Sequence, residues 1–216
     1  MLYLSDTNLF YNYLISYSIF FKYDLHYSLI EGRDFTKIDF FRKILQHFFN
    51  KKNTKKQIQE SLRELRAYLN PSKKTSINIK FNFNHHHFKI NNKSLKELEF
   101  YFLEFFVAYE FLVLIEQRNE KINNILVEFN NSLAHILFAL ENNNNFLMKI
   151  NINKAKSHLY RGTLDCYKEI LLANPSIIKK NYNLYLKIRA KEALNMGKSE
   201  DIKKILVEKY KLLIQK

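Results

Sequence analysis

Apolar residues recur every three or four positions along most of this chain, and that spacing is typical of amphipathic α-helices. The spacing predicts helices from about residue 5 to residue 47, with a break near Gly32, and from Thr54 to Asn70. The second helix ends before Pro71, because a residue that precedes a proline avoids the helical region. Aromatic residues crowd the stretch from Tyr11 to Tyr27, where they fit a core or a protein interface better than a surface for stacking bases.

The spacing changes to two between Ser76 and Asn91. Apolar residues there alternate with asparagine and lysine, at Ile77, Ile79, Phe81 and Phe83. Alternation of this kind indicates a strand with one buried face. A second short apolar stretch follows the polar residues 84–86, so the sequence predicts a small β-hairpin near residues 76–91, the single sheet of the protein.

The longest helical pattern begins at a capping box, in which Ser94 precedes Glu97 by three residues. Its apolar stripe continues to Leu140, with a break near Asn119, and a run of asparagines at residues 142–145 ends it. Three more helices are predicted, at residues 153–172, 176–196 and 199–214. We therefore expect an all-α fold, a multi-helix bundle with one small β-hairpin.

Two regions are expected within this fold. Residues 1–92 form an N-terminal helical region with a basic segment and the hairpin, and residues 93–216 form a helical bundle. One continuous domain is the alternative. The composition agrees with a helical fold, because 3 glycines and 2 prolines leave little material for the tight turns of a sandwich or a barrel. The same scarcity of glycine argues against the Gly-rich phosphate loop of nucleotide-hydrolysing enzymes.

The sequence carries no pattern of export or of membrane insertion. Its one cysteine, Cys166, excludes an intramolecular disulfide and suits a reducing compartment. The first residues lack the basic and apolar regions of a signal peptide. The apolar stretch from Leu98 to Ile115 contains three glutamates, which are costly inside a bilayer. We therefore expect a cytoplasmic protein that does not interact with membranes.

The formal net charge is +14, and it is unevenly distributed. Residues 42–74 and the chain after Pro175 are basic, whereas residues 94–141 are acidic. Segregation of this kind suits RNA or another polyanion, or an assembly in which acidic and basic faces meet; a solvated surface is the third interpretation. The candidates for nucleic-acid binding are six basic residues, Lys51, Lys52, Lys55, Lys56, Arg63 and Arg66.

A short polar motif lies in the longest helix, where Asn130 and Asn131 are followed after three residues by His135. With the long helices between Leu95 and Leu172, this motif resembles the HEPN superfamily, whose members carry an arginine, a polar residue and then a histidine. In that family two copies of the motif meet across a dimer and cut RNA without a metal. Asn131 and His135 match the polar residue and the histidine, while Asn130 stands at the position of the arginine. The resemblance therefore implies a metal-independent endoribonuclease that has lost the cation that would hold the phosphate.

The next helix offers a replacement for that cation. Lys154, His158, Arg161 and Asp165 share one face of it at helical spacing. Histidine can move a proton to or from a ribose hydroxyl, and Arg161 would contact the phosphate if the two helices pack antiparallel. The candidate catalytic residues are accordingly His135, Asn131, Arg161 and His158.

Each of these groups also has a simpler structural interpretation. His135 fits the interior of a bundle beside Leu133, and the face around His158 fits an exposed, salt-bridged surface. The triplet His85–His87 places two imidazoles on one strand face. A zinc site needs three or four fixed ligands, however, so we interpret the triplet as a polar hairpin tip. No metal and no cofactor is expected.

The sequence thus leads to two hypotheses of different classes. The first is an RNA-binding helical protein of a prokaryotic toxin or phage-defence module, with degenerate or absent ribonuclease activity. The alternative is a non-catalytic assembly subunit with segregated acidic and basic faces. The resemblance also implies a homodimer or a larger assembly, because the histidines of that family meet at a dimer seam.

Overall fold

The computed structural model of the protein describes residues 9–10, 12–18, 20–21, 36–49, 53–68, 92–115, 119–141, 144–195 and 200–215. These residues are almost wholly helical and include no strand, so the all-α class is confirmed for this part of the chain. The β-hairpin predicted near residues 76–91 lies outside the described residues. Among the described helices, none combines the length and the apolar character needed to cross a membrane.

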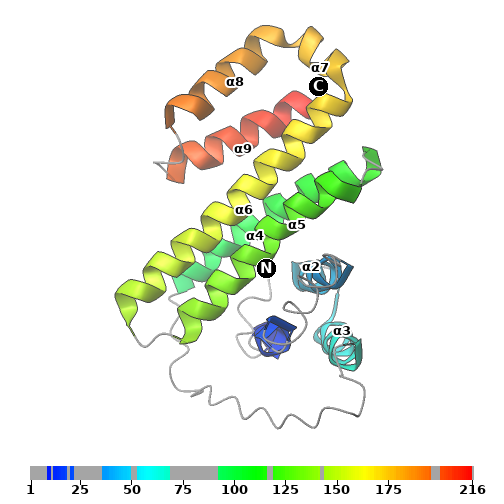
Figure 1. Ribbon diagram of the computed structural model, residues 1–216, viewed down its shortest axis with the longest axis vertical. Helices are drawn as coiled ribbons and strands as arrows, with labels where there is room; N and C mark the ends of the chain where they lie inside the picture. The colour runs from blue at the N-terminus through cyan, green and yellow to red at the C-terminus, as the bar shows by residue number, and fades with distance from the viewer. Residues whose placement is uncertain are drawn as a thin grey trace. The chain divides into compact units, whose positions relative to one another are not determined.

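Figure 1 shows the order of the helices along the chain. The described residues between 9 and 21 are helical. The helices that follow are α2 (Thr36–Phe49), α3 (Lys55–Tyr68), α4 (Asn92–Ile115), α5 (Asn119–Glu141), α6 (Asn145–Ala173), α7 (Pro175–Lys180), α8 (Tyr182–Asn195) and α9 (Glu200–Ile214).

Local hydrogen bonds explain two of the helix beginnings. At α3, the side chains of Thr54 and Gln57 form a capping box: the Gln57 Oε1 accepts from the Thr54 backbone N–H at 2.7 Å, and the Thr54 Oγ1 accepts from the Gln57 N–H at 3.3 Å. At α6, the Asn144 Oδ1 accepts from the N–H groups of Phe146 and Leu147. The helix predicted from residue 153 therefore begins earlier, at Asn145. Asn144, which belongs to the break predicted between the two helices, is its N-cap.

The single helix predicted over residues 176–196 was wrong, since the structure has two helices there. The break falls at Asn181, whose backbone N–H bonds back to Ile177 and Ile178 and closes the end of α7. Its side-chain amide also donates to the Ile177 carbonyl at 3.2 Å. A side chain that competes for backbone acceptors in this way favours the end of a helix over its continuation.

The contacts divide the chain into two compact units that interleave along the sequence. The first unit comprises residues 1–99 and 133–155, and the second comprises residues 100–132 and 156–216. The boundary predicted between residues 92 and 93 stays a prediction.

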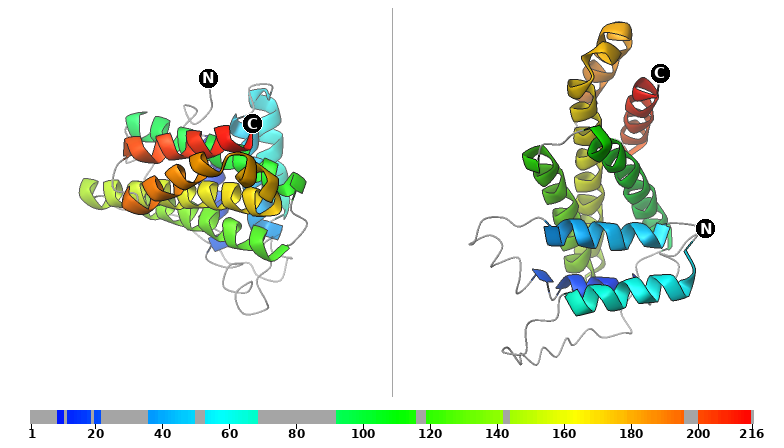
Figure 2. Two further views of the ribbon diagram at one scale, coloured as in Figure 1. Left: turned by 90° about the horizontal axis from the view of Figure 1, so that it is seen from above. Right: turned by 90° about the vertical axis from the view of Figure 1, so that its right-hand side faces the viewer.

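The core of the first unit is aromatic. Tyr13 and Tyr17 are buried against Phe41 of α2 with their rings at steep angles to it, and the Tyr13 hydroxyl donates to the Phe41 carbonyl at 3.0 Å. Phe20 completes this cluster, with its ring centroid 5.2 Å from that of Phe41. The described aromatic residues of the N-terminal stretch therefore serve a core, and α3 packs beside α2 (Figure 2).

The core of the second unit is a stack of phenylalanines between α4 and α5. Phe105 lies parallel to Phe129 with ring centroids 5.6 Å apart, and both are fully buried. Helix α6 approaches this stack at Gly162, where a Cβ atom would lie 2.7 Å from the ring of Phe105. Glycine at this position therefore allows a closer helix contact than any other residue would.

Candidate functional site

His135, the central residue of the predicted motif, lies half-buried on α5 in the first unit. Its Nδ1 is 3.0 Å from the side-chain oxygen of Asn151 on α6, and the amide of Asn151 donates to the Leu147 carbonyl. Leu133 and Ile136 on either side of it are fully buried. His135 therefore stands at the edge of a core, with one ring nitrogen engaged by a neutral amide.

The other residues of the motif belong to the second unit. Asn131 is half-buried, and Asn130 is buried at the position that the resemblance assigns to a phosphate-binding arginine. His158 and Arg161 also lie in the second unit. The predicted catalytic set is thus divided, with His135 in one unit and the remaining three residues in the other.

Within the second unit, His158 and Arg161 of α6 meet Glu128 of α5. The His158 Nδ1 lies 2.7 Å from the Glu128 Oε2 and 2.7 Å from the Arg161 Nη2, which is itself 3.3 Å from the same carboxylate oxygen. Arginine only donates hydrogen bonds, so Nδ1 cannot accept from Arg161 and donate to Glu128 at once. Both side chains nevertheless converge on the same carboxylate oxygen of Glu128.

Gly162 explains why these three side chains meet. A Cβ at this position would lie 3.3 Å from the Cβ of Glu128 as well as against Phe105. The missing side chain lets α6 lie close to α5 where Glu128 faces the turn that carries His158 and Arg161. The sequence did not single out Glu128, because its partners are thirty positions away.

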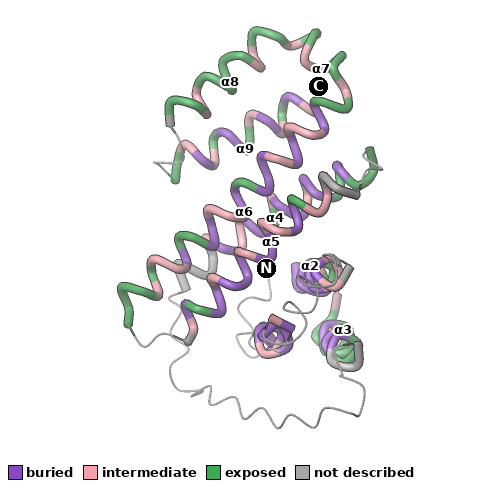
Figure 3. Tube along the Cα trace, viewed as in Figure 1, coloured by how far each residue is buried: buried purple, intermediate pink, exposed green. Residues whose placement is uncertain are grey.

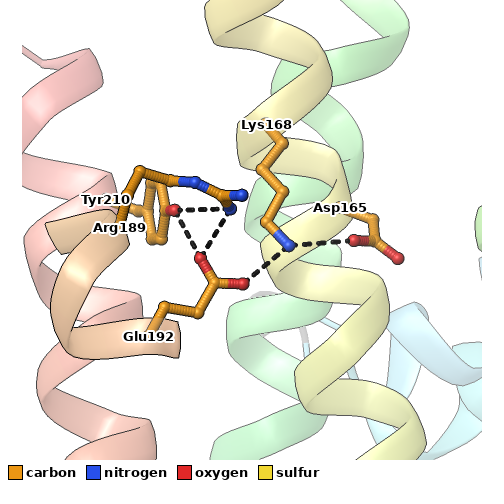
Figure 4. Close-up of polar contacts among 5 residues, drawn as sticks. All are labelled: Asp165, Lys168, Arg189, Glu192 and Tyr210. Carbon is orange, nitrogen blue, oxygen red and sulfur yellow. Dashed lines mark hydrogen bonds and ion pairs between the residues drawn. The ribbon is translucent and has the colours of Figure 1, made fainter. Parts of the chain in front are cut away.

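The polar face of α6 continues to Lys168, and Figure 4 shows the ion pairs that it forms there. The Lys168 Nζ lies 2.8 Å from Glu192 of α8 and 3.4 Å from Asp165. The second oxygen of Glu192 accepts from Arg189 at 2.8 Å and from the Tyr210 hydroxyl of α9 at 2.7 Å. One carboxylate therefore joins three helices of the second unit.

The pKa values of Asp165 and Glu192 shift in opposite directions. Burial raises the pKa of Asp165, repulsion from Glu128 and Glu192 adds to it, and Lys168 only partly opposes these effects. Burial would also raise the pKa of Glu192, but the hydrogen bonds from Lys168 and Tyr210 and the nearby charges outweigh it, so that pKa is lowered. The sequence predicts that the face of α6 around His158 is either catalytic or salt-bridged. In the structure, charged residues of this face form ion pairs with Glu128 and Glu192.

The predicted nucleic-acid candidates are only partly placed. Lys55, Lys56 and Arg63 are exposed on α3, Arg66 lies on the same helix, and Lys51 and Lys52 fall outside the described residues. Glu60 and Glu64 are exposed on the same helix, so its surface mixes both signs of charge.

A more strongly basic surface lies on α7 and α8, and the candidate set missed it. From Ile170 to Lys191 the sequence contains five cations and no carboxylate. Lys179, Lys180 and Lys187 are exposed, and their side chains make no ion pair with another residue that the structure describes. The absence of carboxylates between Ile170 and Lys191 is the sequence feature that could have identified this basic surface. We call these three lysines the α7–α8 basic surface.

The described residues contain no group of three histidine, cysteine, aspartate or glutamate side chains placed to hold a metal ion. The triplet His85–His87 lies outside the described residues. Cys166 is fully buried on α6, as expected of a small core residue.

Comparison of this chain with protein-family models, with curated proteins and with solved structures finds no match. The function is therefore inferred from the residues themselves.

Proposed function

We propose that the protein binds RNA through the α7–α8 basic surface and does not cleave it. The observation that carries this proposal is the concentration of exposed cations on α7 and α8 without an intervening carboxylate. Each lysine that contacts a phosphate releases a condensed counterion, and this release supplies most of the free energy of nonspecific binding. The exposed cations of α3 are a weaker candidate surface, because Glu60 and Glu64 lie among them.

The proposed absence of cleavage follows from charge. Arg161 and His158 both face Glu128, and Asp165 lies one turn further along α6. A phosphate brought to His158 would meet two carboxylates and one cation, although transition-state stabilisation of phosphoryl transfer requires an excess of positive charge. Asn130 adds no charge to the motif, so the arrangement favours a structural role for these polar residues. Membership of a toxin or phage-defence module remains part of the same proposal.

Binding is expected to depend steeply on salt. Log affinity falls as log salt rises, and each contact with a phosphate of single-stranded nucleic acid contributes about 0.7 to the magnitude of this slope. Changing Lys179, Lys180 and Lys187 together to glutamine should therefore reduce the magnitude of the slope by about 2. Fluorescence anisotropy with a labelled RNA over a range of salt concentrations measures the slope.

The matched control changes Lys55, Lys56 and Arg63 on α3 to glutamine, which removes the same charge from the other candidate surface. Failure to detect RNA binding even at low salt would contradict the proposed function. A slope lowered only by the α3 variant would move the binding surface to α3.

No cleavage is expected when the protein is incubated with structured or unstructured RNA, either with EDTA or with added magnesium. Gel analysis of the RNA checks this. Cleavage that persists in EDTA and is lost in either His135→Asn or His158→Asn would show that the motif is active and that the non-cleaving proposal is wrong. Cleavage that requires a metal would point to residues such as His85–His87 instead.

The assembly alternative and the homodimer stay predictions. An assembly subunit should lose its self-association when charges on the basic segment from Lys51 to Lys56 are reversed, with no dependence on His135.

A further inference from the structure

One side of α8 carries apolar side chains that remain exposed in the second unit. Tyr182, Leu186 and Leu194 have exposed fractions of 56, 45 and 81%. They are four and eight residues apart, so they lie along one side of the helix. We call them the apolar strip of α8. Ile188 lies on the opposite side and is buried, and Figure 3 shows exposed and intermediate residues along most of α8.

The apolar strip is bordered by the α7–α8 basic surface. Lys179 and Lys180 end α7 immediately before Tyr182, and Lys187 follows Leu186 on α8. From Tyr182 to Leu194 the strip extends about 18 Å, at about 1.5 Å of rise per residue. An exposed ring therefore stands between cations at one end of an apolar strip, and the carboxylate nearest to the strip along α8, Glu192, is already paired with Lys168 and Arg189.

From this juxtaposition we infer that the α7–α8 surface binds single-stranded rather than duplex nucleic acid, with phosphates at the three lysines and a base against the ring of Tyr182. The inference rests on the proposed function and specifies its ligand. A duplex presents phosphates outward and hides the faces of its bases, so it would satisfy the lysines and leave the apolar strip in water. An unpaired strand offers both phosphates and apolar base faces. The leucines of the strip provide further surface for bases or riboses beyond the tyrosine.

The test compares three ligands: a single-stranded RNA, the same RNA annealed to its complement, and heparin, which is a polyanion without bases. The wild-type protein should bind the single strand more tightly than the duplex. Tyr182→Leu should weaken binding of the single strand at least about fivefold, because stacking of a base on an aromatic ring is worth about 1–3 kcal/mol. The same substitution should leave binding of heparin unchanged, and Tyr182→Phe, which keeps the ring, should bind the single strand like the wild type.

The matched control is Phe146→Leu, which removes another highly exposed ring, on α6 in the first unit, and should leave binding unchanged. Because both aromatic residues are exposed, neither substitution should alter the helical circular dichroism, which confirms that the variants are folded.

Equal affinity of Tyr182→Leu and wild type for the single strand, or equal affinity of the wild type for duplex and single strand, would overturn this inference and leave the proposed function standing. The absence of binding to all three ligands would overturn the proposed function itself. An acidic helix of a protein partner would then be the remaining candidate ligand of the apolar strip.

Discussion

Replacing Phe105 with alanine is expected to lower the free energy of unfolding by about 3–5 kcal/mol, the usual cost of removing a buried phenylalanine. The ring is fully buried on α4, where it stacks on Phe129 of α5 and on Tyr109 one turn away. Alanine would leave a cavity that neighbouring rings fill only in part. Urea denaturation followed by far-UV circular dichroism measures the change, and a loss below about 1 kcal/mol would contradict this close packing.

A second substitution tests whether α6 really lies against that ring. In the wild type, Gly162→Ala should be destabilising by about 1–2 kcal/mol, because its Cβ would lie 2.7 Å from the Phe105 ring. In the Phe105→Ala background the same substitution should cost about 1 kcal/mol less, because only the 3.3 Å approach to the Cβ of Glu128 remains. A double-mutant cycle measures this coupling. Equal effects of Gly162→Ala in both backgrounds would mean that Gly162 and Phe105 do not touch.

Replacing Glu192 with glutamine is expected to cost about 1–3 kcal/mol at neutral pH. The carboxylate accepts from Arg189 and Tyr210 with one oxygen and contacts Lys168 with the other, and an amide cannot accept from all three. Helix α8 depends strongly on this residue, because Ile188 is its one fully buried side chain among those described. Urea denaturation at neutral pH measures the loss. Glu208→Gln on α9 removes the same charge at an exposed position and should change stability by less than about 0.5 kcal/mol.

The effect of Glu192→Gln should also depend on pH. The pKa of Glu192 is lower in the folded protein than in the unfolded chain, because the bonds from Lys168 and Tyr210 outweigh burial. Its contribution is therefore fully present above the unfolded pKa, and it is lost as the pH falls through the folded pKa. The difference between wild type and variant should shrink from about pH 5 downward. A difference that is constant between neutral and acid pH would show that the carboxylate charge is not what Glu192 contributes.

The sequence by itself determined the helices and several of their ends. Helical spacing and capping residues act within one or two turns, so α3 with its Thr54 and Gln57 cap could be predicted from neighbouring residues alone. The same local character explains the errors. Asn144 and Asn181 are both turn-forming residues by type, but one begins a helix and the other ends one, and only the backbone bonds around them distinguish the two roles.

The tertiary structure alone decided which charged residues are paired. Arg161 and His158 had the composition of a catalytic or phosphate-binding face, but Glu128 reaches them from α5, and Glu192 of α8 reaches Lys168 further along α6. Their meeting depends on the close approach that Gly162 permits and on the return of α8, neither of which any local pattern encodes. Lys179, Lys180 and Lys187 look the same in sequence as the lysines of α6, and they differ because no helix of the second unit brings a carboxylate to these three among the described residues. Ion pairing depends on distance in space, and residues thirty positions apart acquire that distance only when helices pack.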